Sequence, residues 1–186
     1  MSEALLQVQA VSKHFGGFTA LSAVSVEVRQ GERFGLIGPN GSGKTTLINC
    51  VSGTLRNESG TIVFAGEEIS GLPAYQRTRR GIARSFQIPR PFASMSVLEN
   101  LVVPLEFVVH RRSLHQADTR EEAMVILRSI GLADKADTPS NRLSQVELRK
   151  LELARAMAAK PRLLISDEAM AGLSSNEVRE VLDILF

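Results

Sequence analysis

Hydrophobic and polar residues alternate in three short stretches near the start of the chain. The first covers residues 5–11, the second carries Val24, Val26 and Val28, and the third carries Ile62 and Phe64. Because successive side chains of a strand point to opposite faces, a period of two predicts half-buried strands, which we expect to pair antiparallel. The N-terminal part of the chain is therefore predicted to form an antiparallel β layer.

Two other apolar runs are continuous rather than alternating. Phe34–Ile37 is one of them, and Leu163–Ile165 is the other. Short runs of this kind are typical of strands that are buried on both faces of a parallel sheet. We expect both runs to be buried strands and the second to lie in the centre of a parallel sheet.

The middle of the chain has the spacing of helices. The first helix is predicted to start at Ser96, which forms a capping-box pattern with Glu99, and to be limited by Pro104. The second is predicted to start at Asp118 with Glu121 and to end at Gly131. The third is predicted to start at Ser144 and to end before Pro161. A polar connector at residues 110–116 is expected to be exposed. The predicted fold class is α/β, with one domain over residues 1–186 and a helical subdomain within it at about residues 90–155.

Composition and charge are those of a globular protein. The 186 residues are 44% apolar and 23% charged, with a net charge of +2 that does not indicate nucleic-acid binding. The densest basic stretch is predicted to be a solvated face, with a membrane-side or partner contact as the alternative; it comprises Arg77, Arg79, Arg80 and Arg84.

Cys50 is the only cysteine, which suits a reducing compartment, and it is expected to be an inert core residue. The most hydrophobic stretch, at residues 97–109, is too short to span a bilayer, and no targeting segment opens the chain. We therefore expect a soluble cytoplasmic domain.

One motif points to a ligand. Nine consecutive residues match the phosphate-binding loop G-x-x-x-x-G-K-[ST]: Gly38, Pro39, Asn40, Gly41, Ser42, Gly43, Lys44, Thr45 and Thr46. The motif lies between a predicted strand and a helical run that Gly53 can end, which is the context that it requires. The glycines let backbone N–H groups turn toward an anion at a helix N-terminus. Lys44 adds a charge for the outer phosphates, and the Thr45 hydroxyl is a ligand for Mg²⁺. A glycine-rich turn that binds nothing is the alternative, which the length and context of the match disfavour.

Two carboxylates follow the second continuous apolar run. Asp167 is placed at a strand end to bind Mg²⁺, and Glu168 can accept a proton from an attacking water. Alone, the pair could be a solvated acidic turn. Together with the phosphate loop, it predicts nucleotide hydrolysis.

With these elements in order, the chain resembles the ATP-binding subunits of ABC transporters over essentially its full length. Within that family it looks most like the importer ATPases for branched-chain (hydrophobic) amino acids. The motifs that carry the resemblance are Phe15-Gly16-Gly17, the phosphate loop, Ser85-Phe86-Gln87, residues 95–100, Leu143-Ser144, Asp167-Glu168 and residues 170–173.

The resemblance implies a P-loop NTPase core of ABC type, with ATP and Mg²⁺ as its cofactors. It implies that Phe15 stacks on adenine, although Phe15 could instead be a core aromatic residue. It implies that Gln87 senses Mg²⁺ and the γ-phosphate and contacts the membrane partner, although Gln87 could be a solvated loop residue. Ser144 would touch the nucleotide of a second ATPase subunit. The expected partners are that subunit and integral membrane permease subunits, which would hold the protein on the inner face of the plasma membrane.

Some residues depart from the family pattern. The usual signature Leu-Ser-Gly-Gly-Gln is replaced by residues 143–147, which read Leu-Ser-Gln-Val-Glu. Glu147 brings a carboxylate close to the expected position of a partner's γ-phosphate, which predicts a weaker ATP-driven dimer than the usual signature gives. Some of that penalty is avoided if Glu147 folds back onto the Ser144 N–H. Ser174 stands where many relatives carry an acidic or amide residue. All three histidines precede Asp167, so none can be the family's switch histidine, and we expect a C-terminal part to be missing.

The expected function is that of an ATP-hydrolysing subunit of an ABC importer, with two alternatives. One is a soluble ABC-type ATPase that acts on ribosomes or DNA, and the other is a non-catalytic nucleotide-binding regulator. The guanine-reading motif Asn-Lys-x-Asp is absent from the sequence, so GTP is not expected.

Overall fold

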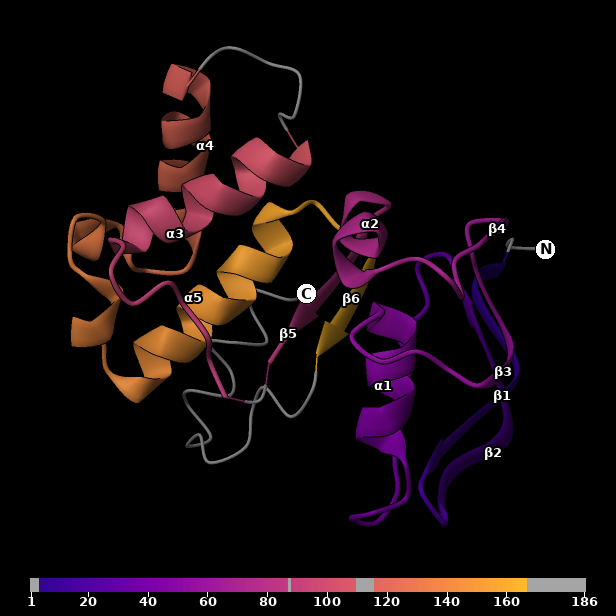
Figure 1. Cartoon of the computed structure of the whole chain (residues 1–186). Coiled ribbons are helices and arrows are strands. Elements are labelled where there is room, and N and C mark those ends of the chain that lie inside the picture. The colour runs from indigo at the N-terminus through magenta and orange to yellow at the C-terminus, as the bar shows by residue number, and fades with distance from the viewer. Residues whose placement is uncertain (1–3, 87, 110–115, 167–186) are drawn as a thin grey trace. The chain divides into compact units, whose positions relative to one another are not determined.

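The computed structural model describes residues 4–86, 88–109 and 116–166. These residues belong to two compact units, Met1–Ile82 and Ala83–Phe186, whose elements are labelled in Figure 1.

The first unit is built on the predicted antiparallel layer. Its sheet has the order β2-β1-β3-β4, formed by β1 (Ala4–Phe15), β2 (Phe18–Arg29), β3 (Ser59–Phe64) and β4 (Glu67–Glu68). Val8 pairs with Val26 on one side and with Ile62 on the other. Val8 and Ile62 are buried, so the alternating pattern correctly predicted the strands. The buried face of β1 does not follow strict alternation, because Ala10 is exposed and Val11 is buried after a register shift between Val8 and Val11.

Two helices complete this unit. The helix α1 (Lys44–Ser52) starts directly after the phosphate loop and ends at Gly53, whose φ of 79° is left-handed. The short helix α2 (Ala74–Arg79) follows β4. Cys50 is fully buried in α1, and burial raises the pKa of its thiol. Both the helical run with its glycine stop and the core position of Cys50 are confirmed.

The expected buried strand at Phe34–Ile37 is wrong. These residues form no regular structure, and Ile37 is 95% exposed. A strand of a parallel sheet is stabilised by hydrogen bonds to neighbouring strands and by layers on both faces. Within the described part of the first unit, the sheet consists of β1, β2, β3 and β4. The run at Phe34–Ile37 therefore has no neighbouring strand there to stabilise it.

The second unit contains a two-stranded sheet and the predicted helices. The strands β5 (Ile82–Ser85) and β6 (Leu163–Ser166) pair with each other. The position of β6 was predicted, but its apolar side chains are half-buried rather than fully buried. The helical elements are α3 (Val97–Pro104), the π-helix η1 (Leu105–Val109), α4 (Gln116–Ser129), the 3₁₀ turns η2 (Ala133–Lys135) and η3 (Ser140–Arg142), and α5 (Gln145–Ala158).

The helices of this unit share one hydrophobic core. Leu101 and Leu105 from the first helical segment, Leu127 from α4 and Leu151 from α5 are all fully buried in it. Both α3 and α5 begin with a complete capping box, as the sequence predicted. The α-helix ends at Pro104, which lacks the N–H needed to continue the regular pattern, and the chain goes on as a π-helix. Within the described residues, α4 runs from Gln116 to Ser129, over the helix predicted to open near Asp118.

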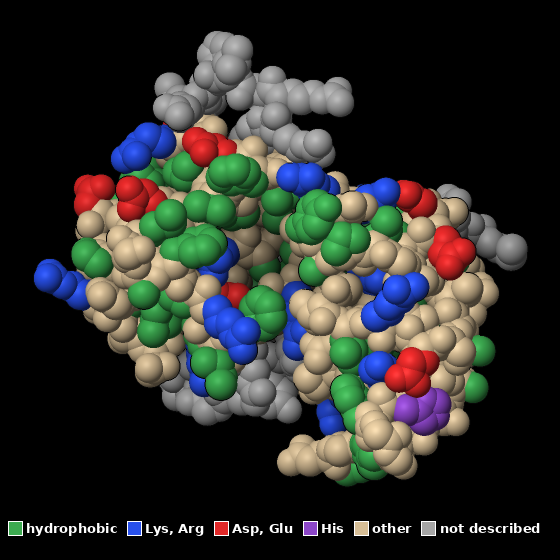
Figure 2. Space-filling view, viewed as in Figure 1, with side chains coloured by type: hydrophobic (Ala, Val, Ile, Leu, Met, Phe, Trp, Pro, Cys, Tyr) green, Lys and Arg blue, Asp and Glu red, His purple; other side chains and the backbone are tan. Residues whose placement is uncertain are grey.

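The basic stretch is not one solvated face. Arg77 is buried with 1% of its surface exposed, whereas Arg80 forms an ion pair with Glu67 at 2.7 Å. On the face shown in Figure 2, Lys and Arg side chains are interspersed with hydrophobic and acidic ones. In the part of the chain that the structure describes, no helix is both long and apolar enough to cross a membrane.

Candidate functional site

The loop before α1 depends on two glycines with left-handed backbone. Gly41 has a φ of 80° and Gly43 a φ of 88°. A Cβ atom on Gly43 would lie 2.5 Å from the carbonyl oxygen of Ala20, a distance that would force the backbone to move. Only glycine therefore fits the position where the loop enters the helix.

The first turn of α1 has the character of an anion site. Gly43 occupies the N-cap position and offers no side chain to the helix amides, and the first turn contains no acidic residue. The N–H groups at this end carry a partial positive charge from the helix dipole. Thr45 and Thr46 lie in this same turn. The residues present thus fit a phosphate group.

Lys44 adds a full charge to this site. Its ammonium donates hydrogen bonds to the carbonyl oxygens of Gly38 at 2.6 Å and Pro39 at 2.9 Å. The N–H of Ser42 donates to the same Pro39 carbonyl at 3.2 Å, which closes the loop into a tight turn. Lys44 therefore lies back across the loop, and its charge is held beside the helix N-terminus.

Phe15 lies at the end of β1, where it pairs with Phe18. The residue is 50% exposed, so the alternative of a core aromatic residue does not fit. The ammonium of Lys13 lies 5.4 Å from the ring centroid, a distance at which a cation interacts with an aromatic face. One face of the ring is thereby engaged by Lys13. Stacking of adenine on Phe15 stays a prediction.

Sequence reasoning missed the carboxylate that organises this strand end. Glu58 accepts hydrogen bonds from the Lys13 ammonium at 2.8 Å and from the His14 backbone N–H at 3.2 Å, and it lies 2.7 Å from His14 Nδ1. The bond from Lys13, followed by that from His14, lowers the pKa of Glu58 to about 2. No local pattern could reveal this cluster, because Glu58 lies 45 positions from Lys13 and 44 from His14 in the sequence.

Ser144 and Glu147 form the predicted capping box of α5. The Ser144 hydroxyl accepts the Glu147 N–H at 3.3 Å, and the Glu147 carboxylate accepts the Ser144 N–H at 2.9 Å. Glu147 also forms an ion pair with Lys135 of η2. Lys135 and the Ser144 N–H together lower the pKa of Glu147. The carboxylate does fold back onto Ser144, and a cation that the sequence gave no reason to expect neutralises it.

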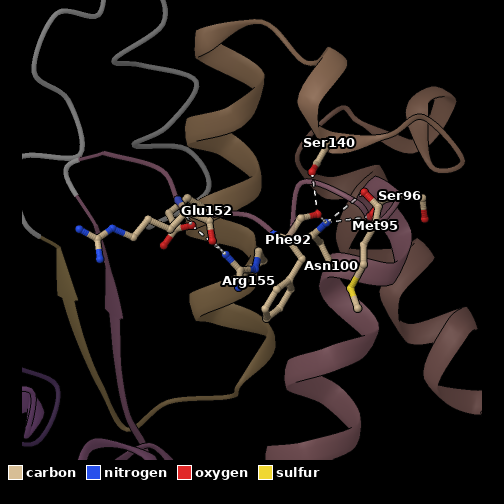
Figure 3. A network of polar contacts seen from close by, with 8 residues as sticks. Phe92, Met95, Ser96, Asn100, Ser140, Glu152 and Arg155 are labelled. Carbon is tan, nitrogen blue, oxygen red and sulfur yellow. Dashed lines mark hydrogen bonds and ion pairs between the residues drawn. The ribbon is translucent and has the colours of Figure 1, made fainter.

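The segment after Gln87 is held by side chains of two helices, as Figure 3 shows. Asn100 of α3 accepts the Phe92 N–H at 2.8 Å and donates to the carbonyls of Phe92 and Ser96 at 3.2 and 2.9 Å. Glu152 of α5 accepts the Arg90 N–H at 3.2 Å. Arg155 donates to the Arg90 carbonyl at 2.8 Å.

These contacts fix the segment and leave an aromatic ring exposed. The guanidinium of Arg155 lies 4.8 Å from the ring centroid of Phe92, and Phe92 keeps 41% of its surface exposed. Asn100 and Glu152 are both buried. Phe92 is thus presented to solvent on a backbone that buried polar groups hold in place.

Three of the predicted catalytic and metal-binding residues lie outside the described residues: Gln87, Asp167 and Glu168. The same is true of Ser174. The structure therefore brings together the phosphate loop, Lys44 and Thr45 in the first unit. Ser144 lies in the second unit.

Known proteins share this arrangement of elements. A family model for ABC transporters matches residues 21–171. The high-affinity branched-chain amino acid transport ATP-binding protein LivG of Salmonella typhimurium is 37% identical over 198 residues, which cover 100% of this chain and 77% of LivG. The probable branched-chain amino acid transport ATP-binding protein LivG of Archaeoglobus fulgidus is 41% identical over 179 residues, covering 91% of this chain and 69% of the relative. The ADP conformation of MJ1267, an ATP-binding cassette of an ABC transporter, matches with a TM-score of 0.85 and 31% identity over 99% of this chain and 76% of that one. The chain therefore belongs to the ATP-binding proteins of the ABC transporter family, and its fold is that of an ABC ATPase.

Proposed function

We propose that the protein hydrolyses ATP to energise an ABC importer of branched-chain amino acids. The observation that carries the ATP-binding half of this proposal is the Lys44 ammonium held across the phosphate loop at the uncapped start of α1. The substrate half is supported by the relatives from Salmonella typhimurium and Archaeoglobus fulgidus, whose names specify branched-chain amino acid transport.

In this proposal the phosphate loop binds the triphosphate through its amides and through Lys44. The Thr45 hydroxyl and the Asp167 carboxylate would hold Mg²⁺, and Gln87 would complete its ligands. When bound, the metal ion neutralises charge on the phosphate oxygens. Lys44 leaves the Gly38 and Pro39 carbonyls for the phosphates, which offer stronger charge-assisted hydrogen bonds.

Glu168 would orient the attacking water and accept its proton. Such a general base contributes about 10²–10⁴-fold to a rate. Phe15 would stack on adenine with the ring face that Lys13 leaves free. Ser144, at the start of α5, would touch the nucleotide of a second ATPase subunit, so that two subunits enclose two nucleotides.

The membrane partners would be permease subunits, which would hold the protein at the inner face of the plasma membrane. Gln87 and the segment that follows it are the proposed contact. The exposed ring of Phe92 and the exposed side chain of Ile88, at 72%, support this choice, because apolar side chains presented on a fixed backbone suit a protein interface.

Two measurements test the proposal. ATP turnover by the protein is expected to fall by about 10²-fold or more in Lys44→Ala and in Glu168→Gln, while Glu168→Gln still binds ATP. Leucine uptake into vesicles that contain the protein and the permease encoded by adjacent genes should require ATP and should be lost in both variants. If the protein binds ATP but does not hydrolyse it, the alternative of a non-catalytic regulator is favoured. If it hydrolyses ATP and co-purifies with ribosomes rather than with membranes, the alternative of a soluble ABC-type ATPase is favoured.

A further inference from the structure

The most deeply buried charge among the described residues of the first unit belongs to Arg77 of α2, which is 1% exposed. Its guanidinium donates to the carbonyls of Cys50 at 2.6 Å and Val51 at 3.0 Å, both in the last turn of α1. It also donates to the carbonyls of Ser70 at 3.0 Å and Leu72 at 2.8 Å, in the loop before α2. One side chain thus joins the end of α1 to the next helix and its loop.

These partners are unusual for a buried cation, because all four of them are backbone carbonyls and none is a carboxylate. The last carbonyls of a helix lack partners within the helix and carry the negative end of its dipole. Arg77 satisfies two of them and supplies a matching charge. A guanidinium can do this because its N–H donors fan out in one plane, which no other side chain offers.

Gly53 makes this close approach possible. With a φ of +79°, it ends α1, and a Cβ atom there would lie 2.7 Å from Arg77 Nε and 3.0 Å from the Ala74 backbone nitrogen. The end of α1 therefore contacts both the Arg77 side chain and the start of α2 directly. Gly53 and Arg77 form one joint between the two helices.

This joint lies at the opposite end of α1 from the phosphate loop. A helix of 9 residues is only about 13 Å long, so a tilt of about 5° at one end moves the other end by about 1 Å. Misplacement of about 1 Å can weaken a preorganised site by about 10²-fold. At the phosphate end, no side-chain cap fixes the helix direction.

We propose that Arg77 is a positioning residue of the nucleotide site: it fixes the direction of α1 by holding its C-terminal carbonyls, and so keeps the amides and Lys44 at the other end in place for phosphate. The inference rests on nucleotide binding at Lys44, which Lys44→Ala tests separately, and it does not depend on what is transported.

The test uses the full-length protein and compares Arg77→Met, Arg77→Lys and Gly53→Ala. Arg80→Met is the matched control, because Arg80 lies in the same stretch but pairs with Glu67 at the surface. Val8→Ala is a second control, which lowers stability through the buried sheet residue Val8. For each variant, calorimetry gives the Kd for Mg-ATP at a temperature where circular dichroism shows it to be folded.

Arg77→Met and Gly53→Ala are expected to weaken Mg-ATP binding by about tenfold or more. Arg77→Lys should fall between Arg77→Met and the wild type, because an ammonium keeps the charge but reaches fewer carbonyls. Arg80→Met and Val8→Ala should bind within about twofold of the wild type.

Wild-type affinity in folded Arg77→Met or Gly53→Ala would overturn the proposal. An equal loss of affinity in Val8→Ala would also overturn it, since general destabilisation would then explain the effect. If Arg77→Met does not fold, the affinity of Arg77→Lys relative to both controls decides between these outcomes.

Discussion

The surroundings of Glu147 decide how strongly its negative charge weakens the proposed ATP-dependent dimer. Its carboxylate binds the Ser144 N–H and pairs with Lys135. It therefore fills the anion position at the start of α5 with a charge from the chain itself. A phosphate that approaches Ser144 would meet this carboxylate, and Lys135 reduces the repulsion.

Glu147→Gln is expected to strengthen ATP-dependent dimerisation by roughly two- to fivefold, the range of an exposed charge interaction. The amide keeps the capping box, because its oxygen still accepts the Ser144 N–H, so the helix start is preserved. Lys135→Met should weaken the dimer, because Glu147 then keeps its full charge. Ultracentrifugation of the variants in a Glu168→Gln background measures both effects. Glu121→Gln, on the exposed face of α4, is the control, and a Glu147→Gln dimer no tighter than this control would contradict the prediction.

At this scale, the sequence predicted contacts within a turn and missed contacts between elements. Ser144 and Glu147 are three positions apart, so their capping box could be read directly from the spacing. Lys135 and Glu58 could not be assigned, because the fold brings them to their partners. Arg77 was misread for the same reason: four neighbouring basic residues look alike until the tertiary structure buries one of them.

Among the elements, α3 depends on a buried amide that holds the segment before it. The Oδ1 atom of Asn100 accepts one N–H from Phe92, and its Nδ2 group faces the carbonyls of Phe92, Met95 and Ser96. Asn100→Ala removes the acceptor of the Phe92 N–H and one donor to these carbonyls, which keep their hydrogen bonds from Met95, Ser140 and the Asn100 backbone. It is expected to lower the free energy of unfolding by about 1–3 kcal/mol.

Asn100→Asp should cost more than Asn100→Ala, although it is the smaller change in shape. The carboxylate would keep the bond from the Phe92 N–H but would place a negative oxygen against carbonyl oxygens. Urea unfolding at neutral pH gives the comparison, with Asn141→Asp in an exposed position of η3 as the control. Equal stability of Asn100→Asp and Asn100→Ala would contradict this account of the network.

Helices and strands with a clear local sequence signal were predicted well. A strand that depends on pairing with neighbouring strands was not. The strands β1 to β3 and the starts of α3 and α5 follow from alternation and capping patterns. Phe34–Ile37 has the composition of a buried strand, but composition does not supply the neighbouring strands that such a strand needs. The π-helix after Pro104 was also beyond prediction, because only the broken hydrogen-bond pattern could be foreseen from the proline.

For the whole molecule, the order of motifs along the chain identified the family, although the residues with proposed roles come from both units of the chain. Phe15 and Lys44 belong to the first unit, and Ser144 belongs to the second. Motif order is a property of the sequence and could be read at once. Ser144 is proposed to contact the nucleotide of a second subunit, and Gln87 lies outside the described residues, so their roles stay predictions.

Phe92 lies on the segment that is proposed to contact the membrane subunits. Phe92 presents its ring on a segment that Asn100, Glu152 and Arg155 hold in place, so little conformational freedom would be lost when a partner covers it. An aromatic anchor of this kind contributes roughly 2 kcal/mol or more to an interface. We therefore expect Phe92→Ala to weaken binding to the permease by about tenfold or more, measured by titration of the subunit onto permease in nanodiscs. Phe107→Ala is the matched control, because Phe107 is also exposed, at 63%, but lies on the π-helix η1. A similar loss in both variants would show that exposed aromatic residues act without regard to position, and no loss in Phe92→Ala would place the permease contact elsewhere.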